Sequence, residues 1–324
     1  MVATIVLTQN NIAPAAVNNG NNQFVYQFPS SVAFPNHEIA IQNISMYYSW
    51  VNINSTTLNN NTFYYYWNTS GSGVKQFPVV IPDGLYEIST INSYLQFQMI
   101  KNGHFWTDSA GNYIYFIEMV VNVNTYTVQI NTYPVPATVP SGYTGGSAAA
   151  TGQGYTPYAN PGAAFIPVVS MCNTSGVYNN FYKVVGFTPT FSTYVVGGVY
   201  QYAPYVTSST LNQSVISTVA PQVQPNPTLF LAVSNIDNKY SNPSTIVYQL
   251  SPTVAFGELI TITPAQFAYN KLLPGTYNGI RLQILGTNLQ PINILDPAIT
   301  ITLVIRDRKD VSLVDALGTA TGGK

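Results

Sequence analysis

The chain has 324 residues and a formal net charge of −1, and Asp, Glu, Lys and Arg make up only 6% of it, whereas an ordinary soluble protein has about 25%. The near-neutral balance argues against a nucleic-acid-binding protein, which needs a basic face. A hydrophobic content of 46% argues against a disordered chain. Aromatic residues reach 13%, with 25 tyrosines, which is typical of proteins that place much of their surface against other subunits.

Strand patterns dominate the first third of the chain. Alternating apolar residues predict strands over 24–28 and 38–50, and an aromatic run predicts a strand over 62–67. A further apolar segment, 76–81, stops at Pro82-Asp83-Gly84, whose residue types favour a turn. These segments indicate β-sheets with at least one buried face.

One segment predicts a helix, over 89–102. Ile91, Leu95 and Met99 recur at helical spacing. Ser89 is expected to cap the N-terminus, and Asn102-Gly103 is expected to end the helix. Such an apolar stripe is typical of a helix that packs against a sheet, so we assign it no functional role.

The remainder of the chain returns to strands with two irregular interruptions. Residues 134–167 are rich in Pro, Gly, Ala, Ser and Tyr and predict an extended excursion over the surface or onto a neighbour, with disorder as the alternative. Residues 188–227 predict a second irregular loop, preceded by a short helical turn at 179–185. Strands are predicted over the segments 112–122, 125–133, 229–236, 245–250, 259–263, 277–285 and 298–305.

Many short strands with long crossings and little helix predict an all-β fold, a single jelly-roll β-sandwich with one short helix and long Gly/Pro-rich insertions. This domain is expected to span 1–305, with the surface insertion at about 134–167 and the irregular loop at about 188–227 inside it. Residues 306–324 are predicted to form a polar C-terminal tail. The basic residues Arg306, Arg308 and Lys309 are offset by neighbouring aspartates and are expected to be solvated.

Residues that carry chemistry are few and scattered, so we predict no catalytic, cofactor-binding or metal-binding residues and no enzyme. Carboxylates such as Glu118 and Glu258 show no spacing that selects a catalytic pair. His37 and His104 are far apart in the chain and have no paired ligand nearby. The single cysteine, Cys172, allows no intrachain disulfide and is expected to be a buried thiol. No apolar run reaches the ~18 residues of a membrane-spanning helix.

Aromatic clusters are the remaining candidates for a site. In a strand, alternate side chains point to opposite faces, so about half of each aromatic run is expected to meet solvent or a partner. The candidate contact residues for a second subunit or another partner are Tyr48, Trp50, Tyr64, Tyr66, Trp67, Tyr143, Tyr155 and Tyr158. Stacking of such rings on sugars or nucleobases is the alternative.

The order of several segments resembles the penton, or vertex, proteins of virophages and related Polinton-type elements. The resemblance extends over about 77–305, and the order and spacing of segments carry it, because no single motif is diagnostic. Its segments are 77–88 (Phe-Pro-Val-Val-Ile-Pro-Asp-Gly-Leu-Tyr-Glu-Ile) with the helix through Tyr94-Leu95, Gly186-Phe187, 231–240 with Ser241 and Pro243-Ser244, 254–257, 275–278, Pro291-Ile292 and Asp296-Pro297.

This resemblance implies a jelly-roll subunit that forms a homopentamer at the fivefold vertices of an icosahedral capsid and contacts major capsid proteins. It implies a location in the virion, with assembly in the host cytoplasm, and carries over no catalytic residue. The alternative is a spike or fibre-head module that recognises host surface glycans. A β-sandwich glycosidase is a third hypothesis, against which the scattered carboxylates argue.

Overall fold

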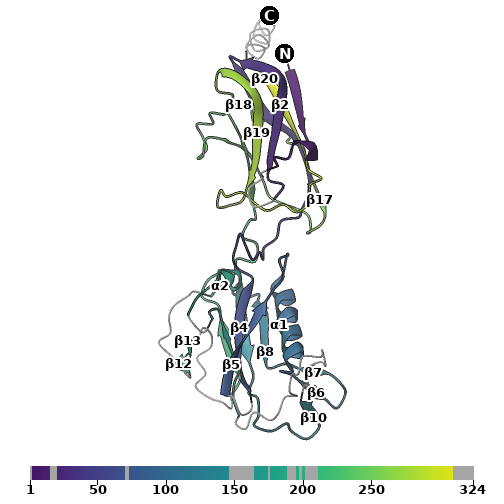
Figure 1. Cartoon of the computed structure of the whole chain (residues 1–324), viewed down its shortest axis with the longest axis vertical. Coiled ribbons are helices and arrows are strands. Elements are labelled where there is room, and N and C mark those ends of the chain that lie inside the picture. Colours follow the sequence, from purple (N-terminus) through teal and green to yellow (C-terminus); the bar gives the residue numbers. More distant parts are fainter. Residues whose placement is uncertain are drawn as a thin grey trace, which may run out of the picture. The chain divides into compact units, whose positions relative to one another are not determined.

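The computed structural model describes residues 2–14, 20–69, 73–145, 164–173, 176–187, 195–196, 199–200 and 211–308. The chain divides into two compact units: unit 1 comprises Met1–Val51 and Asn226–Lys324, and unit 2 comprises Asn52–Pro225. Unit 2 is therefore inserted within the chain of unit 1 (Figure 1). This differs from the predicted single domain over 1–305, because each unit has a hydrophobic core of its own.

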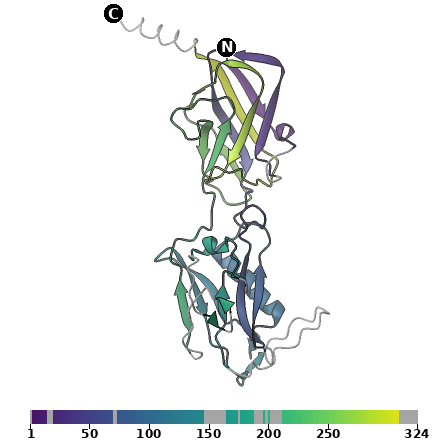
Figure 2. The same ribbon diagram turned by 60° about the vertical axis from the view of Figure 1, so that its left-hand side comes forward.

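Unit 1 consists of two antiparallel sheets. One sheet has the strand order β1-β20-β3-β17, and the other has the order β16-β15-β19-β2. The strands are β1 (Val2–Leu7), β2 (Gln23–Phe34), β3 (His37–Tyr47), β15 (Leu229–Val233), β16 (Ile246–Leu250), β17 (Leu259–Ile262), β19 (Gly275–Leu285) and β20 (Thr300–Asp307), with the two-residue β18 (Asn270–Lys271) also pairing with β3 and a 3-10 turn, η1 (Gln9–Asn11), after β1. A five-stranded and a four-stranded sheet whose main strands are connected in this order form a jelly roll, so the predicted fold class is confirmed (Figure 2).

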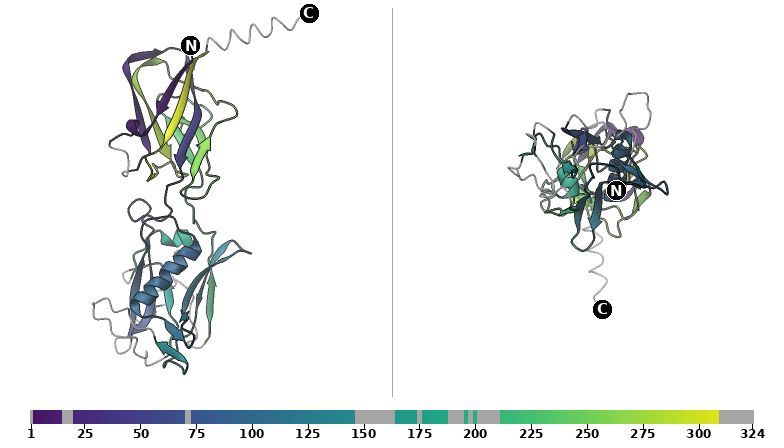
Figure 3. Two further views of the ribbon diagram at one scale, coloured as in Figure 1. Left: turned by 90° about the vertical axis from the view of Figure 1, so that its right-hand side faces the viewer. Right: turned by 90° about the horizontal axis from the view of Figure 1, so that it is seen from below.

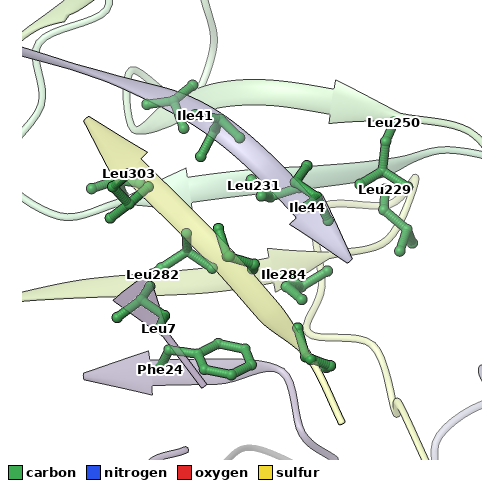
Figure 4. Packing of buried hydrophobic residues seen from close by; sticks show 14 of the residues in the cluster. Leu7, Phe24, Ile41, Ile44, Leu229, Leu231, Leu250, Leu282, Ile284 and Leu303 are labelled. Carbon is green, nitrogen blue, oxygen red and sulfur yellow. The ribbon is translucent and has the colours of Figure 1, made fainter. Parts of the chain in front are cut away.

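The core of unit 1 lies between the two sheets. Leu7, Ile44 and Leu303 from one sheet face Phe24, Leu282 and others from the opposite sheet (Figure 4). Ile41 and Ile44 both point inward although their spacing is odd, because the β3–β20 ladder contains a bulge between Thr302 and Leu303. Each such side chain contributes about 1.5–3 kcal/mol when it is removed from water.

Within its described residues, unit 2 contains three three-stranded antiparallel sheets, a two-stranded sheet of β12 and β13, and two helices. The three-stranded sheets have the orders β11-β4-β5, β14-β9-β8 and β10-β6-β7. Helix α1 (Ile88–Asn102) contacts β8, and the amide of Asn92 accepts a hydrogen bond from the backbone of Met119 (Figure 3). The other elements are β4 (Thr62–Thr69), β5 (Gly73–Val80), β6 (Trp106–Asp108), β7 (Tyr113–Ile114), β8 (Ile117–Asn122), β9 (Thr127–Thr132), β10 (Tyr143–Gly145), β11 (Val168–Ser170), α2 (Phe181–Val185), β12 (Val195–Val196), β13 (Val199–Tyr200) and β14 (Gln213–Ile216).

Helix α1 agrees with the sequence prediction except at its first turn. Ile91, Leu95 and Met99 are fully buried, and Gly103 ends the helix in the left-handed conformation with φ 73°. The prediction that Ser89 caps the helix is wrong. The helix begins one residue earlier, and the N-cap residue is Glu87, whose side chain makes no capping hydrogen bond.

The predicted strands are present, and the structure adds strands where irregular chain was expected. Residues 112–122 form two strands, β7 and β8, instead of one. Within 134–167, Val135 pairs with Phe165 and β10 pairs with β6, while the excursion over 146–163 lies outside the described residues. Strand β14 pairs with β9 inside the segment expected to be irregular. The predicted tail begins too early, because β20 continues through Asp307, and 309–324 lie outside the described residues.

Gly186 closes α2 at a point where a side chain cannot fit. Its φ is 76°, and a Cβ atom there would lie 2.2 Å from the carbonyl oxygen of Val219. Gly186→Ala is therefore expected to lower the free energy of unfolding of unit 2 by about 2–4 kcal/mol, measured by urea denaturation. The matched control is Gly111→Ala, because Gly111 has φ 86° but open space at Cβ, and it should cost about 1–2 kcal/mol. Equal losses for the two variants would contradict the role of the backbone contact.

Candidate interaction surfaces

The structure brings together no catalytic constellation in its described part. No three His, Cys, Asp or Glu side chains there group as a metal site. Glu118 belongs to unit 2, where its carboxylate accepts hydrogen bonds from Asn131 and Tyr133, and Glu258 belongs to unit 1, where it accepts one from the backbone of Ala255. These contacts tie Glu118 on β8 to the neighbouring strand β9 and Glu258 to its own loop.

The turn aspartates and the cysteine have structural partners. Asp83 accepts hydrogen bonds from Asn54 and Ser55, and Asp296 accepts one from the backbone of Ala298, so both organise turns. Cys172 is fully buried, as expected. Among the described residues, no helix has the length and apolar character needed to cross a bilayer.

Four of the eight predicted aromatic contact residues lie in the interior. Trp50 and Trp67 are fully buried, and Tyr48 and Tyr66 are nearly so. Tyr64 is half-buried, and Tyr143 on β10 is 42% exposed. Tyr155 and Tyr158 lie outside the described residues. Of this set, only Tyr64 and Tyr143 present side-chain surface in the described structure, and their contact with a partner stays a prediction.

Tyr66 lies on the side of β4 opposite Tyr65 and Trp67, and its ring is nevertheless buried. Its hydroxyl accepts a hydrogen bond of 2.6 Å from the amide of Gln76, which also donates to the backbone oxygen of Cys172 at 2.9 Å. The chain around Cys172 thus covers this side of the β4–β5 pair. Burial raises the pKa of the Tyr66 hydroxyl above its usual value, so the group stays neutral.

Unit 1 carries an extended sheet surface without charge, which the sequence patterns did not single out. On β1, Ile5 and Leu7 point inward, so Thr4 and Val6 point outward. The ladders place Val6 opposite Thr302 of β20 and Thr302 opposite Asn43 of β3, and β17 continues the surface on the other side of β3. Thr4 lies at its margin, opposite the buried Val304. We name this surface the uncharged face; it consists of Thr4, Val6, Asn43, Ser45, Tyr47, Leu259, Thr261, Thr300 and Thr302.

The uncharged face combines exposed apolar groups with short polar side chains. Val6, Tyr47 and Leu259 are exposed large hydrophobic residues, and Tyr47 lies directly opposite Leu259 in the β3–β17 ladder. A partner protein can cover such a surface without removing a charge from water, which would be costly. The alternation of β1 is the sequence signal that could have revealed this face.

Charged groups mark the end of the same sheet. Arg306 on β20 forms an ion pair of 2.5 Å with Glu38 on β3, and its guanidinium lies over the ring of Tyr269 at 3.4 Å from the centroid. Arg308 approaches the other carboxylate oxygen of Glu38 at 3.7 Å. The two arginines, expected to be solvated, therefore have specific partners in the fold. The ion pairs also set the boundary of the uncharged face.

Comparisons with known proteins give structural similarity only. No protein-family model matches the chain, and no curated protein matches it. The mavirus penton protein, solved by crystallography, is 10% identical, with a TM-score of 0.37 and coverage of 94% of this chain and 97% of that one. A chain of the Sputnik virophage structure, solved by cryo-EM, is 11% identical, with a TM-score of 0.40 and coverage of 96% and 98%. Similarity at this level defines neither fold nor function, and the jelly roll is established by the strand order of unit 1.

Proposed function

We propose that the protein is a structural capsid subunit without catalytic activity. In this proposal, unit 1 assembles with copies of itself into a pentamer at the fivefold vertices of an icosahedral shell, where it contacts major capsid proteins. The observation that carries the proposal is the uncharged face of a jelly roll in a chain with only 6% charged residues. The segment order that resembles virophage vertex proteins supports the position at the vertex. The protein would accordingly be found in virions after assembly in the host cytoplasm.

Ring formation requires two different contact surfaces on each subunit, because one face of each copy meets another face of the next. The uncharged face supplies one of them. Its threonine, serine and asparagine side chains can exchange hydrogen bonds with water for hydrogen bonds with a partner, while Val6, Tyr47 and Leu259 add apolar area. Jelly rolls suit this arrangement, since their sheets leave short edges and free end loops.

Native mass spectrometry of the purified chain tests the assembly. We expect a species with about five times the chain mass of 35.3 kDa and fivefold symmetry by electron microscopy. A chain that stays monomeric at micromolar concentration and is absent from purified particles would contradict the proposal.

A charge placed in the uncharged face tests whether this surface forms the contact. Thr302→Glu, at the centre of the face, is expected to shift the pentamer towards monomers. Thr276→Glu is the matched control, because Thr276 is exposed on β19 in the opposite sheet of unit 1. An unchanged pentamer in Thr302→Glu would exclude this face from the interface.

Burial removes the two tryptophans from the rings that could support the glycan-binding alternative. A ring that stacks on a sugar must be exposed on at least one side, and Trp50 and Trp67 are fully buried. We therefore favour the capsid role over a receptor-binding role for these aromatic clusters.

A further inference from the structure

His104 lies in an aromatic box in the core of unit 2. Only 5% of its surface is exposed. The imidazole stacks on the indole of Trp67 with centroids 4.6 Å apart and planes at 14°, and the ring of Phe77 meets it edge-on at 4.5 Å. Its Nδ1 atom lies 2.8 Å from the hydroxyl of Tyr65. A histidine in this position forms part of the core of its unit.

The hydroxyl of Tyr65 connects His104 to the end of helix α1. The amide nitrogen of Asn102 donates to this hydroxyl at 2.8 Å. When the neutral ring carries its proton on Nε2, Nδ1 of His104 accepts the proton of the same hydroxyl at 2.8 Å. Protonation of Nδ1 would remove this acceptor, so the buried hydroxyl would have to turn its own proton away from the ring.

No carboxylate is among the described groups that contact the ring, so an imidazolium there would have no opposite charge to pair with. The groups around it are Tyr65 and Trp67 from β4, Phe77 from β5 and, through Tyr65, Asn102 at the end of α1. Tyr65 is the titratable group among them, and burial raises the pKa of its hydroxyl, so it stays neutral. Burial also lowers the pKa of His104 from 6.5 to about 3.

We propose that His104 is an acid-sensitive switch in unit 2, so that a fall from neutral pH to about pH 5 makes the opening of its aromatic box much more frequent while unit 1 keeps its fold. Unit 1 lacks a comparable group, because the only other histidine of the chain, His37, lies half-buried on β3.

Proton linkage gives the direction in which pH changes the stability of unit 2. The pKa of His104 is lower in the folded state than in the unfolded state, so unfolded chains bind more protons and acid favours them. The stability that the neutral ring supports is fully present above pH 6.5 and is lost as the pH falls from 6.5 towards about 3. Between pH 7 and pH 5, the opening equilibrium constant of unit 2 should rise about 25-fold.

Hydrogen exchange of the full chain at pH 7 and pH 5, corrected for intrinsic exchange rates, measures this change in each unit separately. In peptides from β4 and α1, the opening equilibrium constant should rise about 25-fold between pH 7 and pH 5. In peptides from β3 and β20, it should not show this rise. A wild-type chain whose unit 2 shows no such increase overturns the proposal by itself.

Two variants of His104 separate the switch from a general response to acid. His104→Asn keeps an acceptor for the Tyr65 hydroxyl, and His104→Phe keeps the stacking on Trp67; neither titrates in this range, so the pH dependence should disappear in both. His37→Gln is the matched control and should retain it. Retention of the wild-type pH dependence in a His104 variant, or its loss in His37→Gln, would refute the proposal.

Discussion

Replacing Trp50 with alanine is expected to lower the free energy of unfolding of unit 1 by about 3–5 kcal/mol. The indole is fully buried, and its centroid lies 4.2 Å from that of Tyr48. Its Nε1 atom donates to the backbone oxygen of Asn226 at 3.3 Å. Alanine would leave a cavity beside Tyr48 and a buried carbonyl group without this donor, and both changes favour the unfolded state.

Urea denaturation followed by hydrogen exchange in β3 and β20 measures the loss in unit 1. Tyr240→Ala is the matched control, because Tyr240 is a large aromatic residue of the same unit whose side chain is fully exposed; its effect should stay within about 0.5 kcal/mol. If Trp50→Ala left the stability unchanged but removed binding to a partner, Trp50 would be a contact residue and its assignment to the core would be wrong.

Local patterns were sufficient to predict the secondary structure because they depend on nearby residues. Ile91, Leu95 and Met99 follow the period of a helix, and Gly103 supplies the left-handed conformation that ends it. The jelly roll also followed from the number and punctuation of strands. Strand β14 was missed because Gln213–Ile216 are flanked by polar and proline-rich segments, and only pairing with β9 makes them a strand.

The division into two units was not predicted, because the first crossing point, between Val51 and Asn52, carries no linker signal. A linker is usually polar, flexible and exposed. Here Val51, Asn52 and Ile53 are all buried, and the chain enters unit 2 through residues that already belong to its interior. Both units are rich in strands and apolar residues, so composition does not change at the boundary. The strand order alone shows that residues on either side of the insertion belong to one jelly roll.

The burial of the aromatic residues Tyr48, Trp50, Tyr66 and Trp67 could not be predicted for a related reason. Alternation correctly separates Tyr65 and Trp67 from Tyr64 and Tyr66 on the two sides of β4. It does not reveal that the second side is also covered, as the bonds from Gln76 to Tyr66 and Cys172 indicate. Exposure depends on contacts that are distant in sequence, and these contacts also determine the environment of His104.

Removing unit 2 should leave unit 1 folded, because the two ends of the insertion lie close together. The hydrogen bond from Trp50 to Asn226 joins the last residues before the insertion to the first residue after it. A linker on the order of four Gly and Ser residues reaches about 13 Å and can replace 52–225. We expect this variant to keep the hydrogen-exchange protection of β3, β15 and β20, since the core of unit 1 contains no residue of unit 2.

The same deletion separates folding from assembly. If the uncharged face is the contact surface, the shortened chain should still form pentamers by native mass spectrometry, because every residue of that face belongs to unit 1. Combining the deletion with Thr302→Glu should then abolish the pentamer, whereas Thr276→Glu should not. A shortened chain that folds but remains monomeric would place essential contacts in unit 2, and one that fails to fold would contradict the independence of the two cores.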